Sequence, residues 1–206
     1  MFLGYSWGTV RRIQLRLIAR RFSICWKGAM SEKGKIVVTP LTLSNSNEVV
    51  ELCLFSHPAD PEPHFQSQDV SNGKNLKAEY LSEVLQQVPS CGFVAYLNGK
   101  AIGFVEFYPA AITRSLGLQI PGAGKNSVVI GCLHVSPGFT GMGVARSLLE
   151  HLVDHGKKLK WDSIYTKAFV AEEFNFKPDF LFKKCGFRTA KKSGKSSLLM
   201  RYRLKK

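Results

Sequence analysis

The stretch at residues 135–150, VSPGFTGMGVARSLLE, decides the fold of this chain. It begins at the end of a nearly unbroken apolar run over residues 127–135, which is typical of a strand buried on both faces. A glycine-containing turn follows, and then an apolar stripe at helical spacing predicts a helix over residues 141–155. The stripe consists of Val144, Leu148, Leu149, Leu152 and Val153.

The turn between this strand and helix is suited to holding an anion. The first turn of a helix has unpaired N–H groups and about half a positive charge. Gly141 and Gly143 allow that backbone to approach a ligand closely. We therefore predict a phosphate or pyrophosphate cradle made by the main-chain N–H groups of residues 140–145. A tight strand-to-helix turn that binds nothing is the alternative.

Two common nucleotide-binding motifs do not fit this turn. The dinucleotide fingerprint G-x-G-x-x-G requires a third glycine where Arg146 stands. A P-loop requires Gly-Lys followed by Ser or Thr, and the turn lacks that sequence. Both nucleotide motifs are therefore disfavoured.

The remaining elements alternate between strand and helix patterns. Asn98-Gly99 between two β-rich runs predicts a hairpin over residues 92–108, and Asn45 with Glu48 resembles a helix capping box. We also expect strands at 36–43, 161–169, 187–189 and 197–204, helices at 76–88 and 178–185, and a loop at 57–74. Gly156 should end the helix that begins at 141. This order predicts an α/β (mixed α+β) fold, with one central, mostly antiparallel mixed sheet flanked by helices.

Composition limits the class of protein further. The chain has 206 residues, of which 45% are hydrophobic and 21% are charged, as in an ordinary globular domain. We expect no transmembrane segment, because no stretch reaches the roughly 18 apolar residues that cross a bilayer. Five scattered cysteines without a CxxC pair favour reduced thiols, a cytoplasmic location and no metal site.

Positive charge is concentrated at the two ends of the chain. Residues 1–31 hold six basic residues and no acid, residues 183–206 hold ten and no acid, and the part between is nearly neutral. We expect residues 1–29 to be a basic extension outside the domain, and residues 30–206 to form the domain. A targeting segment, or a helix docked on the domain or on a membrane, is the alternative for 1–29.

Two motifs together resemble a known family. The first comprises Val135, Pro137, Thr140, Gly141, Gly143 and Ala145, and the second comprises Asn175, Leu181, Gly186 and Phe187. They are similar to the acyl-CoA pyrophosphate loop and a downstream motif of the GNAT N-acetyltransferase superfamily. Thr140 stands where the family usually has Arg or Gln. Phe182 replaces a tyrosine that often serves as the general acid.

The resemblance implies an acyl-CoA N-acyltransferase-like fold and transfer of an acetyl group from acetyl-CoA to an amine. Attack would be direct, in a ternary complex, without a metal. N–H groups of the strand at 127–135 would polarise the thioester carbonyl. The residues expected to bind acetyl-CoA are Val135, Thr140, Gly141, Met142, Gly143, Val144, Ala145 and Asn175.

The catalytic base is harder to assign from sequence. His134 and Glu106 are the candidates, with a structural histidine and a solvent-facing acid as the alternatives. Cys132 and Cys185 could act as nucleophiles, although inert thiols are expected. The acceptor, a small-molecule or peptide amine, and the oligomeric state are not readable. There are two alternative functions. One is a catalytically degenerate acyl-CoA-binding sensor. The other is a basic nucleic-acid-binding module, which is less favoured because the sequence has no recognised motif of that kind.

Overall fold

The computed structural model describes residues 34–54, 70–88, 90–114, 116–118, 120–170 and 177–205. The chain divides into two units, Met1–Lys35 and Ile36–Lys206, and all the named strands and helices belong to the second unit. The boundary predicted at residues 29 and 30 lies outside the described residues.

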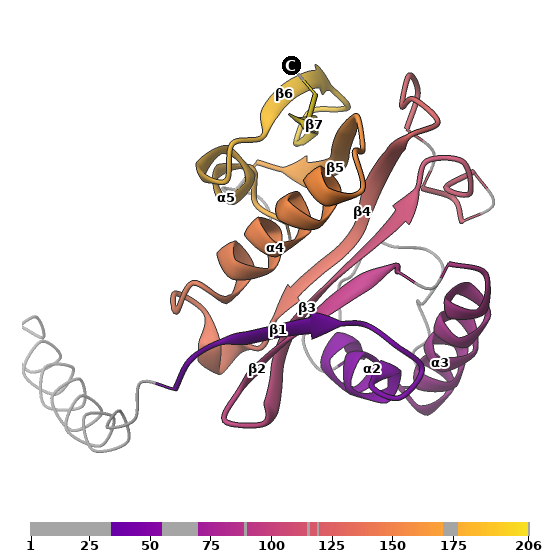
Figure 1. Cartoon of the computed structure of the whole chain (residues 1–206), viewed down its shortest axis with the longest axis vertical. Coiled ribbons are helices and arrows are strands. Elements are labelled where there is room, and N and C mark those ends of the chain that lie inside the picture. Colours follow the sequence, from indigo (N-terminus) through magenta and orange to yellow (C-terminus); the bar gives the residue numbers. More distant parts are fainter. Residues whose placement is uncertain are drawn as a thin grey trace, which may run out of the picture. The chain divides into compact units, whose positions relative to one another are not determined.

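A seven-stranded mixed sheet forms the centre of this unit (Figure 1). Its strands lie in the order β1-β2-β3-β4-β5-β7-β6, and every neighbouring pair is antiparallel except β4 with β5. The strands are β1 (Val37–Pro40), β2 (Gly92–Leu97), β3 (Lys100–Pro109), β4 (Ser127–Val135), β5 (Ser163–Phe169), β6 (Arg188–Lys192) and β7 (Ser197–Arg203). The helices are α2 (Ser46–Leu54), α3 (Val70–Gln87), the short η1 (Pro137–Phe139), α4 (Val144–Lys158) and α5 (Asp179–Lys184). The predicted fold class is confirmed.

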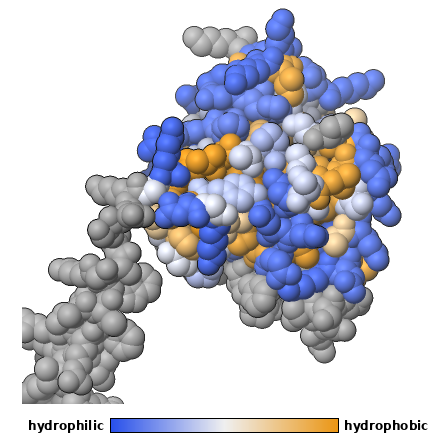
Figure 2. Space-filling view, turned by 60° about the horizontal axis from the view of Figure 1, so that its bottom comes forward, coloured by the Kyte–Doolittle hydropathy of each residue, from blue (hydrophilic) through white to orange (hydrophobic). Residues whose placement is uncertain are grey.

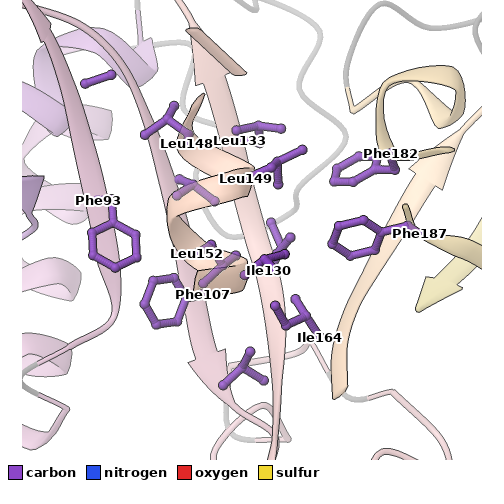
Figure 3. Packing of buried hydrophobic residues seen from close by; sticks show 14 of the residues in the cluster. Phe93, Phe107, Ile130, Leu133, Leu148, Leu149, Leu152, Ile164, Phe182 and Phe187 are labelled. Atoms are coloured by element: carbon purple, nitrogen blue, oxygen red, sulfur yellow. The ribbon is translucent and has the colours of Figure 1, made fainter. Parts of the chain in front are cut away.

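Helices cover the two faces of the sheet in different places. α4 and α5 lie on one face, and α2 and α3 lie on the other (Figure 1). The leucines of α4 point toward the sheet, where they meet Ile130 and Leu133 of β4 (Figure 3). We call these faces the α4 face and the α2 face. Between hydrophilic side chains, hydrophobic ones form separate patches on the surface drawn in Figure 2.

Two local predictions, at the start of α2 and before α3, are wrong. The capping box does not form, because the Asn45 side-chain oxygen accepts from the Thr42 N–H at 2.8 Å and the Glu48 carboxylate accepts from the Tyr96 hydroxyl. The loop predicted at 57–74 is also too long, since α3 already begins at Val70. For the capping box, contacts with Thr42 and Tyr96 override the local pattern.

Gly156 does not end α4, as its sequence position suggests. The helix continues to Lys158, and Gly156 is buried inside it. A Cβ at this position would lie 2.7 Å from Cε3 of Trp161. The glycine is therefore required by a close approach of Trp161 to the helix. The hairpin turn at Asn98-Gly99 is confirmed, with both residues at positive φ.

A buried ion pair joins α3 to the sheet. The Lys77 ammonium lies 2.6 Å from Oε1 of Glu106 on β3, and both side chains are 3% exposed. The Tyr108 hydroxyl donates to Oε2 of the same carboxylate at 2.8 Å. Burial is the largest influence and would lower the pKa of Lys77, but the charge and hydrogen bond of Glu106 together with Cys53 and Cys132 outweigh it and hold the pKa above its ordinary value. Lys77 is therefore charged at neutral pH.

We expect Lys77→Met to destabilise the fold by about 3–5 kcal/mol, because it leaves a buried carboxylate without its counter-ion. The double variant K77M/E106L removes both charges and should recover much of this loss. Urea unfolding of the two variants and the parent chain measures the difference. Equal denaturation midpoints for K77M and the parent would contradict a buried, charged pair.

Candidate active site

The site begins where two parallel strands separate. β4 and β5 pair only from Ser127 with Ser163 to Ile130 with Thr166. Beyond Ile130, β4 continues to Val135, and β3 is its only strand partner among the described residues. A gap therefore opens between β4 and β5 at the C-terminal end of β4, and we call it the fork.

Main-chain N–H groups of β4 point into the fork. The Ser136 N–H donates to the Ile102 carbonyl of β3 at 2.9 Å. Alternate residues of a strand direct their N–H groups to the same side, so those of Leu133 and Val135 point away from β3. Both residues also line a groove that reaches the fork. These two N–H groups are placed to polarise a carbonyl that enters the fork.

The turn after β4 adopts the conformation that glycine favours. Gly141 has φ of 80° and Gly143, the N-cap residue of α4, has φ of 85°. A Cβ added at either glycine would meet nothing within 4 Å. The left-handed backbone, rather than crowding, therefore selects glycine here, and the space beside the turn is open to a ligand.

Most of the predicted cradle is available to an anion. Among the described residues, none accepts a hydrogen bond from the N–H of Gly141, Gly143, Val144 or Ala145. The N–H groups of Thr140 and Met142 differ from the prediction, because they donate to the carbonyls of Pro137 and Phe139, both at 3.4 Å. The cradle thus consists of four of the predicted amides, extended by the first turn of α4.

The groove has a volume of about 500 Å³ and runs from the cradle to the fork. Its walls come from the end of β4, η1, the start of α4 and α5. The lining residues are Leu133, His134, Val135, Phe139, Thr140, Gly141, Gly143, Val144, Ala145, Arg146, Lys177, Pro178, Phe180, Leu181 and Lys184. Three of them are cationic, which favours an anionic ligand.

The groove brings together six of the eight residues expected to bind acetyl-CoA. Val135, Thr140, Gly141, Gly143, Val144 and Ala145 all line it. Met142 does not, and its side chain is 47% exposed. Asn175 lies outside the described residues. Apart from Met142 and Asn175, the residues expected to bind acetyl-CoA therefore lie together in one groove.

The structure places the two candidate bases differently. His134 lines the groove, is 6% exposed and has its ring centroid 5.7 Å from that of Phe104. Glu106 does not line the groove; it is 2% exposed and bound to Lys77 and Tyr108. The solvent-facing alternative for Glu106 is therefore wrong, and the paired carboxylate is less suited than His134 to accept a proton.

The other candidate side chains are unreactive in this setting. A hydrogen bond with Cys53, together with burial, raises the pKa of the Cys132 thiol well above its ordinary value. Burial likewise raises the pKa of Cys185. Phe182 is fully buried against Phe187, with ring centroids 5.3 Å apart (Figure 3). A hydroxyl at position 182 would lie in this apolar core.

Sequence reasoning missed Lys177 at the floor of the groove. Its side chain is 4% exposed, and its ammonium donates to the Gly131 carbonyl at 2.7 Å, at the point where β4 leaves β5. Its φ of 41° is a strained backbone conformation for a residue with a side chain. The only signal in the sequence is a lysine before Pro178, which by itself indicates nothing.

The described part of the chain holds no group of three histidine, cysteine, aspartate or glutamate side chains that could bind a metal. Its helices are also too short or too polar to cross a membrane.

Comparisons with known proteins agree with this geometry. The chain matches solved structures of the same fold at low identity. The N-acetyltransferase of Staphylococcus aureus Mu50 has a TM-score of 0.60 and 16% identity, over 83% of this chain and 99% of that chain. The protein yncA of Salmonella typhimurium, solved with its cofactor acetyl-CoA, has a TM-score of 0.60 and 15% identity, over 84% and 95%. The ribosomal-protein-alanine N-acetyltransferase of Brucella melitensis has a TM-score of 0.59 and 15% identity, over 81% and 99%.

No curated protein matches the chain. A family model described as the acetyltransferase (GNAT) family matches residues 53–187, which include β4, the glycine turn, α4 and α5. The match covers well over half of the chain. This chain therefore belongs to the GNAT acetyltransferase family.

Proposed function

We propose that this protein transfers the acetyl group of acetyl-CoA to an amine by direct attack in a ternary complex. The observation that carries the proposal is the row of unpartnered N–H groups from Gly141 to Ala145, Met142 excepted, beside a groove that leads to the fork. One end of the groove suits a pyrophosphate and the other suits a thioester carbonyl. The acetyl-CoA bound by yncA supports the same ligand for this groove.

Each part of the groove then has a separate task. The cradle amides bind the diphosphate and hold the coenzyme in one orientation. The N–H groups of Leu133 and Val135 stabilise negative charge that develops on the thioester oxygen. Most of the rate increase comes from holding amine and thioester in contact, because this removes the entropy cost of their encounter.

Proton transfer is assigned to His134. The attacking amine must lose a proton, and a neutral imidazole accepts one directly or through water. His134 lines the groove next to Leu133 and Val135, whose N–H groups would face the thioester. We do not assign Glu106 as the general base, because its carboxylate is paired with Lys77 in the core.

Lys177 supplies positive charge at the fork. The coenzyme leaves as a thiolate, and its developing negative charge is stabilised by a nearby ammonium in a site of low polarity. Lys177 is the buried ammonium of the groove lining and lies beside Gly131 at the fork. The absence of a hydroxyl at Phe182 therefore does not by itself favour the acyl-CoA-binding sensor.

We propose a cytoplasmic location for this activity. Within the described residues, Cys91, Cys132 and Cys185 are not in disulfides. Free thiols are maintained in a reducing compartment.

The cradle is tested by Gly141→Asp and Gly143→Asp. Each change should weaken acetyl-CoA binding by about a hundredfold or more, because a carboxylate facing the diphosphate costs several kcal/mol. Gly122→Asp is the matched control, since Gly122 also has positive φ and open space but does not line the groove. Titration calorimetry measures the affinities, and normal binding by folded G141D and G143D would refute the cradle.

His134→Gln should lower turnover at neutral pH by about a hundredfold or more, which is a usual contribution of a general base. In the parent enzyme turnover should fall as the pH is lowered, because the imidazole accepts a proton only when neutral. His151→Gln is the control, since His151 is exposed on α4 and does not line the groove. Coenzyme thiol release followed against pH provides the measurement; the same pH profile in H134Q would remove His134 from the mechanism.

Lys177→Met should lower kcat by about tenfold or more while leaving KM for acetyl-CoA within about threefold, because the charge acts mainly in the transition state. Lys177→Arg keeps the charge and should retain a larger share of kcat. A K177M enzyme with unchanged kcat, or with a loss confined to KM, would contradict this role.

A further inference from the structure

The register of the last three strands sorts their side chains onto the two faces of the sheet. Ile164 and Ala168 of β5 belong to the core under α4, so the odd-numbered residues of β5 point to the α2 face. Directly paired residues share a face. On β5, Lys167 therefore faces this way, with Leu199 of β7 and Lys191 of β6 beside it.

The same pairing continues along the strands. Arg201 pairs with Tyr165 and with Arg188, and Arg203 pairs with Ser163, so these arginines also point to the α2 face. We call the resulting set the basic face: Lys167, Arg188, Lys191, Arg201 and Arg203. Strands β5, β6 and β7 contain no acidic residue. The charge of this face is therefore of one sign.

This positive charge is available to a partner. Arg201 is partly exposed and the other four residues are exposed. Within the described part of the chain, none of the five forms an ion pair with a carboxylate. Lys167 lies over the ring of Phe169, 5.6 Å from its centroid, and this contact supplies no negative counter-charge.

The basic face begins at the fork. Thr166 is the last residue of β5 that pairs with β4, and Lys167 follows it. The groove proposed for the coenzyme is built from α4 and α5, on the opposite face of the sheet. On the α2 face, α2 and α3 cover the region of β3 and β4. An acceptor that reaches the fork from the α2 face therefore passes over β5, β7 and β6.

We infer that the acceptor is an acidic peptide segment whose amine enters the fork and whose carboxylates bind the basic face. This inference rests on the proposed acetyltransferase activity. Arginine binds carboxylates with two parallel hydrogen bonds, and Arg188 lies directly opposite Arg201. Charge complementarity of this kind sets the choice of partner and the association rate.

A second hollow of about 540 Å³ is less suited to select the acceptor. It is lined by α2, the turn of the β2–β3 hairpin and Ser136–Pro137. Glu48 and Glu51 line it, but Glu51 binds the Lys74 ammonium at 2.6 Å and the cationic Lys100 lines the same hollow. Little uncompensated charge remains there to attract a cationic acceptor.

A peptide fits the basic face better than a nucleic acid. Single-stranded nucleic acids bind through bases stacked on exposed aromatic rings. On this face Tyr165 is buried, and the partly buried Phe169 already lies under Lys167. Peptides also carry amines that are nucleophilic once deprotonated, as the proposed reaction requires.

The experiment compares two short synthetic peptides, each with a free N-terminal serine and a C-terminal fluorescein. One continues with alternating aspartate and glutamate, the other with asparagine and glutamine at the same positions. Fluorescence anisotropy gives their affinities for the full chain with and without bound CoA, and thiol release from acetyl-CoA gives kcat/KM. The variants are R188Q/R201Q, and Lys192→Gln as control, because Lys192 is exposed on the same edge strand but faces the α4 side.

We expect the acidic peptide to bind and react about tenfold better than its amide counterpart, with the preference shrinking as salt is added. R188Q/R201Q should lose about tenfold in affinity for the acidic peptide, a few-fold per cation. Its affinity for acetyl-CoA should stay unchanged, and K192Q should behave as the parent.

Three outcomes would overturn the inference. Equal affinity for the two peptides would do so, as would equal losses in K192Q and R188Q/R201Q. The third is tighter binding of a single-stranded oligouridylate than of the acidic peptide, if R188Q/R201Q also loses that oligouridylate binding. If acetyl-CoA binds while charge preference is absent, this inference fails and the proposed function stands. If acetyl-CoA does not bind, the proposed function fails, and the anisotropy without CoA still decides whether the basic face binds carboxylates.

Discussion

The parting of β4 and β5 after Ile130 is the feature on which the site depends. Four residue pairs hold the two strands together, and beyond them the N–H groups of Leu133 and Val135 face a gap instead of a neighbouring strand. A register shift in the β3–β4 pairing leaves Gly131 as an extra residue of β4 at this point. A Cβ on Gly131 would lie 2.7 Å from the Tyr108 ring, so the bulge also requires glycine.

The polar cluster under α3 and the fork share this bulge. Tyr108 packs against Gly131 and donates to Glu106, and Glu106 holds the buried Lys77. The Gly131 carbonyl accepts from Lys177 in the groove. Buried charges of this kind are costly when left without partners, so each must stay paired in one arrangement. A rigid bulge therefore separates a charged core cluster from the groove.

Charge has a different role in three places within the described residues. In the core it is paired, in the groove it lies beside amides that can hold a diphosphate, and on the basic face it is uncompensated. The groove and the basic face meet at the fork, from opposite faces of the sheet. The proposed coenzyme and acceptor thus reach the same point without competing for one surface.

The sequence by itself determined the order of strand, glycine turn and helix from residue 127 onward, but not the end of the helix; it also determined the hairpin at Asn98-Gly99 and the positions of the glycines in the turn. These depend on periodicity, glycine positions and helix termini, which are local properties of the chain. It also showed that the C-terminal segment is basic, but not on which face of the sheet the charges lie. Pairing with β5 decided that, because a shift of one residue would turn every side chain to the other face.

Only the tertiary structure decided the roles of Glu106, Lys177 and Gly156. Glu106 is held by Lys77, a residue 29 positions away, and Lys177 reaches a carbonyl 46 positions away. Gly156 is set by its contact with Trp161 across the end of α4. Such contacts leave no periodic pattern in the sequence, since they depend on how distant segments pack once the sheet has formed.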